Sequence, residues 1–145
     1  MTGTFVVAGG DAAGMSAASK VKRDNPDLDV VVFERGEYVS YAACGMPYYL
    51  KGDVEEFDDL VQVTPEQFRT ERDIDLRLHH DVVAVNPDEG TVTVEDDEGE
   101  RFDQSYDDLL IATGAHAIEP PLDGMDLDGV FTLHDLGHAS EIHTV

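Results

Sequence analysis

The sequence holds one cysteine, Cys44, inside the stretch 40–49, and Pro47 follows it three residues later. Proline is typical of a first helical turn, so this spacing predicts a helix that begins close to the thiol. Backbone N–H groups and the positive end of a helix dipole favour thiolate, the nucleophilic form of cysteine. With no second cysteine in the chain, a reactive Cys44 needs a small thiol, a peroxide, a flavin or another subunit as its partner. The competing interpretation is a buried cysteine that acts as a small apolar side chain.

A glycine-rich turn follows the first apolar run of the chain. Residues 4–8 predict a short buried strand, Gly9 and Gly14 bound the turn, and an alanine-rich helix follows. A second predicted strand, 30–33, ends at Glu34. This order is typical of a dinucleotide-binding βαβ unit, in which the terminal acid holds ribose hydroxyls. The alternative is a packing turn of an α/β fold that binds nothing.

Asp11 stands where this glycine pattern usually has its middle glycine. A carboxylate there lies near phosphate unless its side chain turns away. Alternatively, Asp11 caps the helix that follows, with its backbone N–H still facing the ligand.

Polar residues recur along one face of that helix. Ser16, Lys20 and Arg23 are spaced i, i+4 and i+7 and therefore share a stripe. The chain has only 9 basic residues, so two of them together indicate a site for an anionic ligand. A solvated helix face is the alternative.

Composition predicts one compact domain covering residues 1–145, because 41% of the residues are hydrophobic. The 32 acidic residues give a net charge of −23, which disfavours nucleic acid and anionic membranes as partners. We interpret the dispersed acid as a halophilic-type surface adapted to a high-salt cytosol. Neither a signal peptide nor an apolar run of membrane-spanning length is visible, so we expect a cytoplasmic protein without a membrane partner.

The rest of the chain predicts a helix and further strands. Thr64, Pro65 and Gln67 form a helix start with a capping box, and that helix is expected to run to about Arg72. A strand at 75–78 precedes three strands that should form an antiparallel meander. The apolar run 109–112 predicts a buried strand, and 130–133 a last short one. The three strands expected to form the meander begin at residues 82, 91 and 101.

The histidines offer no metal-ligand spacing, so we expect no metal site. His79, His80, His134, His138 and His143 are all interpreted as surface residues.

Four segments, 9–18, 33–36, 40–49 and 106–114, together resemble the pyridine nucleotide-disulfide oxidoreductases. Within that family the chain is most similar to the single-cysteine branch, the coenzyme A disulfide reductases and NADH oxidases. The resemblance implies an α/β fold: a Rossmann-like FAD-binding domain with a parallel sheet and an inserted antiparallel β-meander. It also implies that electrons pass from NAD(P)H through FAD to Cys44. The implied FAD-binding positions are Gly9, Asp11, Gly14, Glu34, Arg35, Val82, Ala112, Thr113 and Gly114.

In the coenzyme A disulfide reductases, the cysteine forms a mixed disulfide with coenzyme A. Ala43 departs from that family, which often has asparagine there, and so lacks a hydrogen bond to the pantetheine arm. The positions that the resemblance implies for coenzyme A are Ser16, Lys20, Arg23, Ser40, Ala43 and Arg72.

Members of this family are much longer, and no second glycine pattern follows Gly14. We therefore expect an N-terminal FAD-binding fragment that lacks the NAD(P)H and dimerisation domains and does not turn over with NAD(P)H alone. A homodimer is implied for the full-length family and not for this fragment. Three functions remain open: a reductase of a small-molecule disulfide, an NADH oxidase or peroxidase in which Cys44 cycles through sulfenic acid, and a non-catalytic nucleotide-binding module.

Overall fold

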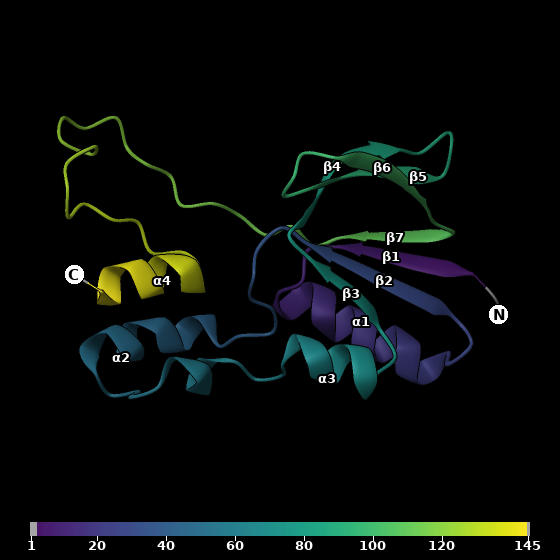
Figure 1. Ribbon diagram of the computed structural model, residues 1–145, viewed down its shortest axis with the longest axis horizontal. Coiled ribbons are helices and arrows are strands. Elements are labelled where there is room, and N and C mark those ends of the chain that lie inside the picture. Colours follow the sequence, from purple (N-terminus) through teal and green to yellow (C-terminus); the bar gives the residue numbers. More distant parts are fainter. Residues whose placement is uncertain (1–2, 145) are drawn as a thin grey trace. The chain divides into compact units, whose positions relative to one another are not determined.

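The computed structural model describes residues 3–144, which divide into two compact units (Figure 1). The first unit contains the chain up to Ser40 together with Val63–Gly114. The second contains Tyr41–Gln62 and the chain from Ala115 onward. The assignment of residues 1–145 to one FAD-binding domain stays a prediction.

The first unit is built on a four-stranded parallel sheet with the strand order β3-β2-β1-β7. Val6 of the inner strand β1 pairs with Val31 on one side and Leu109 on the other. The inner strands are runs of valine because both of their faces are covered. The strands are β1 (Thr4–Ala8), β2 (Asp29–Glu34), β3 (Asp75–Leu78) and β7 (Asp108–Ile111).

Helices α1 (Ala12–Asp24) and α3 (Pro65–Thr70) cover one face of this sheet (Figure 1). Helix α1 ends at Asp24 with Asn25 as its C-cap, since the helical conformation is disfavoured for the residue before a proline. The capping box of α3 is confirmed: Gln67 N donates to Thr64 Oγ1 at 3.2 Å, and the Gln67 side chain accepts from Thr64 N at 3.0 Å. The helix ends two residues earlier than expected.

The other face of the sheet carries the predicted antiparallel meander, which is confirmed. Val92 and Val94 of its central strand are fully buried against Val6, Val31 and Phe33 of the sheet. The meander strands are β4 (His80–Asn86), β5 (Thr91–Asp96) and β6 (Arg101–Ser105). Together, the parallel sheet and the meander confirm the predicted α/β fold class.

His80 corrects one expectation from the sequence, because it is not a surface residue. Its ring is half-buried, 6.2 Å from the ring of Phe33 and 5.9 Å from that of Phe102. Its Nδ1 lies 2.7 Å from Leu78 O. The neighbouring His79 is exposed, as expected. His79 lies outside β4, in the bend between β3 and β4, where it has φ 57°.

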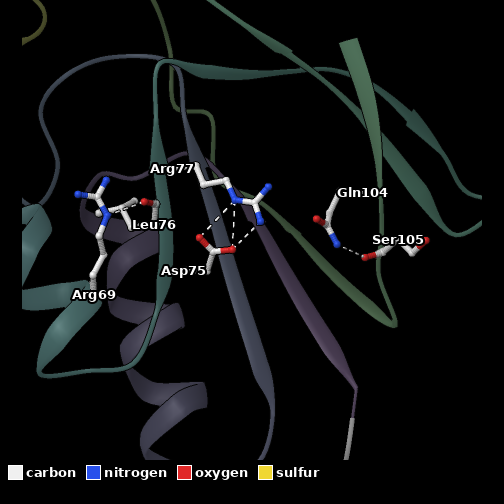
Figure 2. Close-up of polar contacts among 6 residues, drawn as sticks. All are labelled: Arg69, Asp75, Leu76, Arg77, Gln104 and Ser105. Atoms are coloured by element: carbon white, nitrogen blue, oxygen red, sulfur yellow. Dashed lines mark hydrogen bonds and ion pairs between the residues drawn. The ribbon is translucent and has the colours of Figure 1, made fainter. Parts of the chain in front are cut away.

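The two edges of the parallel sheet differ. On β3, Arg69 of α3 donates from Nε to Leu76 O at 2.9 Å and so occupies an outward-facing carbonyl (Figure 2). On β7, Ile111 is 62% exposed, and no strand in the described part of the chain pairs with the free edge. The strand expected at 109–112 is confirmed as β7, but the expectation that it is buried is wrong, because β7 is an edge strand.

The second unit contains helices α2 (Met46–Lys51) and α4 (Leu136–His143). They contact each other through the rings of Tyr49 and His143, whose centroids lie 4.5 Å apart. Tyr49 also packs edge-on against Phe57, at 5.6 Å. Tyr49 therefore joins α2 to α4 and to the segment around Phe57, and aliphatic residues such as Leu60 and Leu136 are also buried in this unit.

Two expectations for the end of the chain are wrong. Residues 130–133 form no strand, and Phe131 is 41% exposed. The segment after them is helix α4, which begins with a capping box between Asp135 and His138. His138 N donates to Asp135 Oδ1 at 3.0 Å, and the ring Nδ1 of His138 accepts from Asp135 N at 3.4 Å. The half-buried imidazole is therefore part of the helix cap rather than a free surface group.

Lys22 fixes the end of α1, and its removal should destabilise the fold. Its side chain is only 12% exposed, and Nζ lies 3.0 Å from Leu28 O and 2.8 Å from Asp73 Oδ2. We expect Lys22→Ala to lower the free energy of unfolding by about 1–3 kcal/mol in urea titrations, because the half-buried Leu28 carbonyl loses its donor, whereas Asp73 is 87% exposed and regains water. Lys51→Ala, which removes the exposed pair with Asp53, should change it by less than about 1 kcal/mol. Equal losses in the two variants would contradict this role for Lys22.

Candidate cofactor and thiol sites

The glycine turn, residues 9–14, lies at the carboxyl end of β1. Gly9 has φ +106°, and a Cβ there would lie 2.3 Å from Ala112 O. Ala112 N in turn donates to Ala8 O at 2.7 Å. The turn and the residues after β7 therefore approach so closely that only glycine fits at position 9.

Gly14 brings α1 equally close to the turn. A Cβ at this position would lie 1.9 Å from Gly9 O, well inside van der Waals contact. Any larger residue must therefore push the helix away from the turn.

The Glu34 carboxylate is fixed at the end of β2 by two backbone donors. Its Oε2 accepts from Gly10 N and its Oε1 from Gly36 N, both at 2.7 Å. Ionised carboxylate oxygens accept further hydrogen bonds, so the group remains able to bind hydroxyls. The sequence predicted the role of Glu34, but it did not predict that the Gly36 N–H would bind the carboxylate, because no spacing rule describes this contact.

Asp11 occupies the N-cap position of α1 in an extended conformation, and its side chain makes no capping hydrogen bond. The alternative in which this side chain caps the helix is therefore wrong. Helix α1 has no acidic residue in its first turn. Its first N–H groups have no intrahelical acceptor, so this end of the helix favours an anion.

These features fit the FAD that the resemblance implies. The missing Cβ atoms let the turn pack closely against Ala112 and α1, the helix start suits a pyrophosphate, and the fixed Glu34 suits a ribose. Val82 lies on β4, where it packs against the cluster that includes Phe33. The residues that meet at the carboxyl ends of the strands are Gly9, Gly14, Glu34, Ala112 and Thr113, with Arg35 and Gly114 next to them in the chain.

A second group of predicted residues meets on α1. Ser16, Lys20 and Arg23 are all exposed on this helix. Arg72, 53 residues from its contact on α1, donates from Nη1 to Ser19 Oγ at 2.9 Å. We call Ser16, Lys20, Arg23 and Arg72 the cationic face. Sequence reasoning placed Arg72 here only by resemblance, and it missed Ser19.

The two cations on α1 differ in their partners. Lys20 forms an i,i+4 ion pair with Asp24, and the hydrogen bond from Lys20 lowers the pKa of that carboxyl group. Arg23 has no ion-pair partner among residues 3–144. An anionic ligand would thus find Lys20 shared with Asp24, whereas Arg23 acts on Asp24 only through a weaker Coulombic interaction.

Cys44 lies in the second unit, in a 3₁₀ turn formed by Ala43–Gly45. Ala42 N donates to Leu60 O at 2.8 Å, and a Cβ on Gly45 would lie 2.6 Å from Leu60 Cδ2. The turn is therefore held against the buried Leu60. The thiol itself is exposed, so the interpretation as a buried apolar cysteine is wrong.

The predicted helix beside the thiol is confirmed, because α2 begins at Met46 with Pro47 in its first turn. Ala43 is exposed next to Cys44 in the second unit, whereas Ser40 ends the first unit. Ser40 has φ 50°, and its N–H donates to Gly10 O at 3.3 Å. The coenzyme A positions as a set remain a prediction.

Two negative findings apply to residues 3–144. No group of three or more His, Cys, Asp or Glu side chains there could hold a metal ion. Nor does that part of the chain contain a helix with the length and apolar character needed to cross a membrane.

Comparison with known proteins gives a match over nearly the whole chain. A family profile described as pyridine nucleotide-disulphide oxidoreductase matches residues 3–145. The NAD(P)H sulfur oxidoreductase (CoA-dependent) of Pyrococcus abyssi is 46% identical over 129 residues, which cover 89% of this chain and 28% of that protein. The coenzyme A disulfide reductase of Staphylococcus haemolyticus is 36% identical over 133 residues, covering 91% of this chain and 30% of the relative.

A solved structure agrees with the fold. The crystal structure of reduced CoADR-RHD from Bacillus anthracis superimposes with a TM-score of 0.95 at 32% identity, covering 99% of this chain and 26% of that one. The chain spans less than a third of the length of the two curated relatives.

Proposed function

Because the chain belongs to the pyridine nucleotide-disulphide oxidoreductase family, we propose that it holds FAD on its first βαβ unit and reduces coenzyme A disulfide through Cys44. The observation that carries this proposal is the exposed Cys44 thiol on a turn anchored to Leu60. The names of the relatives from Pyrococcus abyssi and Staphylococcus haemolyticus support coenzyme A as the substrate class and NAD(P)H as the electron donor.

The first unit would hold the cofactor at the glycine turn. The N–H groups at the start of α1 would bind the pyrophosphate, Glu34 would accept from the ribose hydroxyls, and 112–114 would lie against the rest of the group. When bound, FAD supplies the electron pair that restores the Cys44 thiolate from its disulfide. The chain itself would bind and orient the cofactor, and the glycines at positions 9 and 14 would keep the turn free of larger side chains.

Cys44 would carry out thiol–disulfide exchange. Its thiolate attacks one sulfur of coenzyme A disulfide, a bond forms between Cys44 Sγ and that sulfur, and the bond between the two coenzyme A sulfurs breaks. The second coenzyme A leaves as a thiolate and takes a proton from water. The exposed position of Sγ allows an approach by so large a disulfide.

The cationic face would bind the phosphates of coenzyme A. In a chain with a net charge of −23, a phosphate is repelled by most of the surface. Arg23 and the guanidinium of Arg72 offer charge-assisted hydrogen bonds to it on α1.

Intact mass spectrometry tests the proposed chemistry. After incubation with coenzyme A disulfide, we expect the chain to gain the mass of one coenzyme A less two hydrogens, as a mixed disulfide requires, and Cys44→Ser to gain none. Removal of the added mass by a phosphine reductant would identify a disulfide. A chain that stays unmodified by coenzyme A disulfide and gains only oxygen from hydrogen peroxide would instead support the sulfenic acid mechanism. If Cys44 reacts with iodoacetamide no faster than a free thiol and forms neither adduct, the non-catalytic nucleotide-binding module is the better explanation.

A further inference from the structure

The guanidinium of Arg72 is held at two points in the first unit. Its Nη1 donates to Ser19 Oγ on α1 at 2.9 Å, and its Cζ lies 4.8 Å from the ring centre of Phe68 on α3. Phe68 is 1% exposed and belongs to the core, so the ring is a fixed support. An exposed arginine side chain is normally free to move, whereas this one is tied to both helices.

Ser19 lies in the middle of the cationic face. It follows Ser16 by three residues and precedes Arg23 by four, and on a helix both spacings place side chains next to each other. Its hydroxyl therefore brings the Arg72 guanidinium to the stripe that carries Lys20 and Arg23. Without this contact, nothing else among residues 3–144 bonds Arg72 to α1.

We propose that Ser19 is a positioning residue: its hydroxyl holds the Arg72 guanidinium against α1 so that the cationic face recognises the phosphate-bearing half of coenzyme A. The inference rests on the proposed function of that face. A guanidinium has five N–H groups, and Ser19 occupies one of them. The others have no partner in residues 3–144 and remain available for a two-point contact with a phosphate.

The expected loss of coenzyme A affinity follows from the conformational freedom that the Ser19 hydroxyl removes from the Arg72 side chain. Ordering a long side chain at the moment of binding weakens affinity, and an arginine that is already ordered avoids this loss. We expect Ser19→Ala to weaken coenzyme A binding by roughly three- to tenfold. Ser19→Thr keeps the hydroxyl and should bind like the unmodified chain.

The test is isothermal calorimetry with reduced coenzyme A and with pantetheine, which lacks the nucleotide phosphates, at one fixed salt concentration. The variants are Ser19→Ala, Ser19→Thr, Arg72→Ala and the double variant Ser19→Ala/Arg72→Ala. If Ser19 acts through Arg72, the double variant binds no more weakly than Arg72→Ala, and pantetheine affinity stays unchanged throughout. Arg101→Ala removes one positive charge on the meander and serves as the control for net charge. Circular dichroism spectra confirm that each variant is folded.

The outcomes separate this inference from the proposed function. If the unmodified chain binds coenzyme A no better than pantetheine, or Arg72→Ala has no effect, the cationic face is not the phosphate site and the proposed function loses that support. If Arg72→Ala weakens binding but Ser19→Ala does not, the site stands and the positioning role of Ser19 is wrong. Additive losses in the double variant would also overturn it, since they would show that Ser19 acts independently of Arg72.

Discussion

Alanine at position 14 is expected to lower the free energy of unfolding by about 3 kcal/mol or to prevent folding. Helix propensity alone predicts the opposite, because alanine is favoured over glycine in a helix by about 1 kcal/mol. Steric clashes outweigh this preference, so the stability change is a loss: the new Cβ would lie 1.9 Å from Gly9 O and 3.1 Å from Val7 Cγ1. Gly9 cannot yield easily, since its N–H is bonded to Phe33 O at 2.8 Å.

Urea denaturation followed by circular dichroism measures this loss, and Gly137→Ala is the matched control. Gly137 also lies in a helix, α4, but its nearest foreign atom would be Asp135 Oδ1, a side-chain oxygen 3.2 Å away. That variant should be neutral or slightly more stable. If both variants unfold at the same urea concentration as the unmodified chain, the close packing of α1 against the turn is not what fixes glycine at position 14.

Raising the KCl concentration should stabilise the chain strongly. The net charge of −23 comes from 32 acidic residues against 9 basic ones, and the ion pairs on the surface, such as Lys51–Asp53 and Arg101–Glu95, neutralise few of them. Salt shortens the reach of the remaining repulsion from about 10 Å at 0.1 M to about 3 Å at 1 M. We expect the melting temperature to rise by more than about 10 °C over this range.

Differential scanning calorimetry in KCl and in sorbitol at equal osmolality checks this expectation. Sorbitol favours the compact state without screening charge, so it should reproduce only a small part of the KCl effect. Equal melting temperatures in dilute buffer and in molar KCl would contradict the interpretation of the acidic surface as halophilic.

The first βαβ unit and the meander could be predicted because local signals agree with the final packing. Valine runs, the glycine turn and Asn25 before Pro26 all indicate the same elements that the structure forms. The segment 130–133 has equally favourable strand residues, but the structure provides no neighbouring strand with which it pairs. Strand propensity therefore failed there, since it depends on a partner. Helix α4 was missed because histidine is not a usual partner in a capping box.

The residues of the candidate sites also fall into those that local sequence signals predicted and those that they did not. The glycines, Glu34 and Cys44 carry signals within a few residues of themselves and were found from the sequence. The contact of Arg72 with Ser19 joins residues 53 positions apart, and only the packing of α3 beside α1 creates it. No pattern along the chain reports such a contact.

The double hold on Glu34 has a consequence for cofactor choice. With one oxygen bonded to Gly10 N and the other to Gly36 N, the carboxylate cannot swing aside to relieve a clash. A nucleotide that carries an extra phosphate on its adenosine ribose would bring two like charges together at this point. Under the proposed function, the end of β2 would thus favour the free ribose hydroxyls of FAD and repel an adenosine whose ribose carries a phosphate.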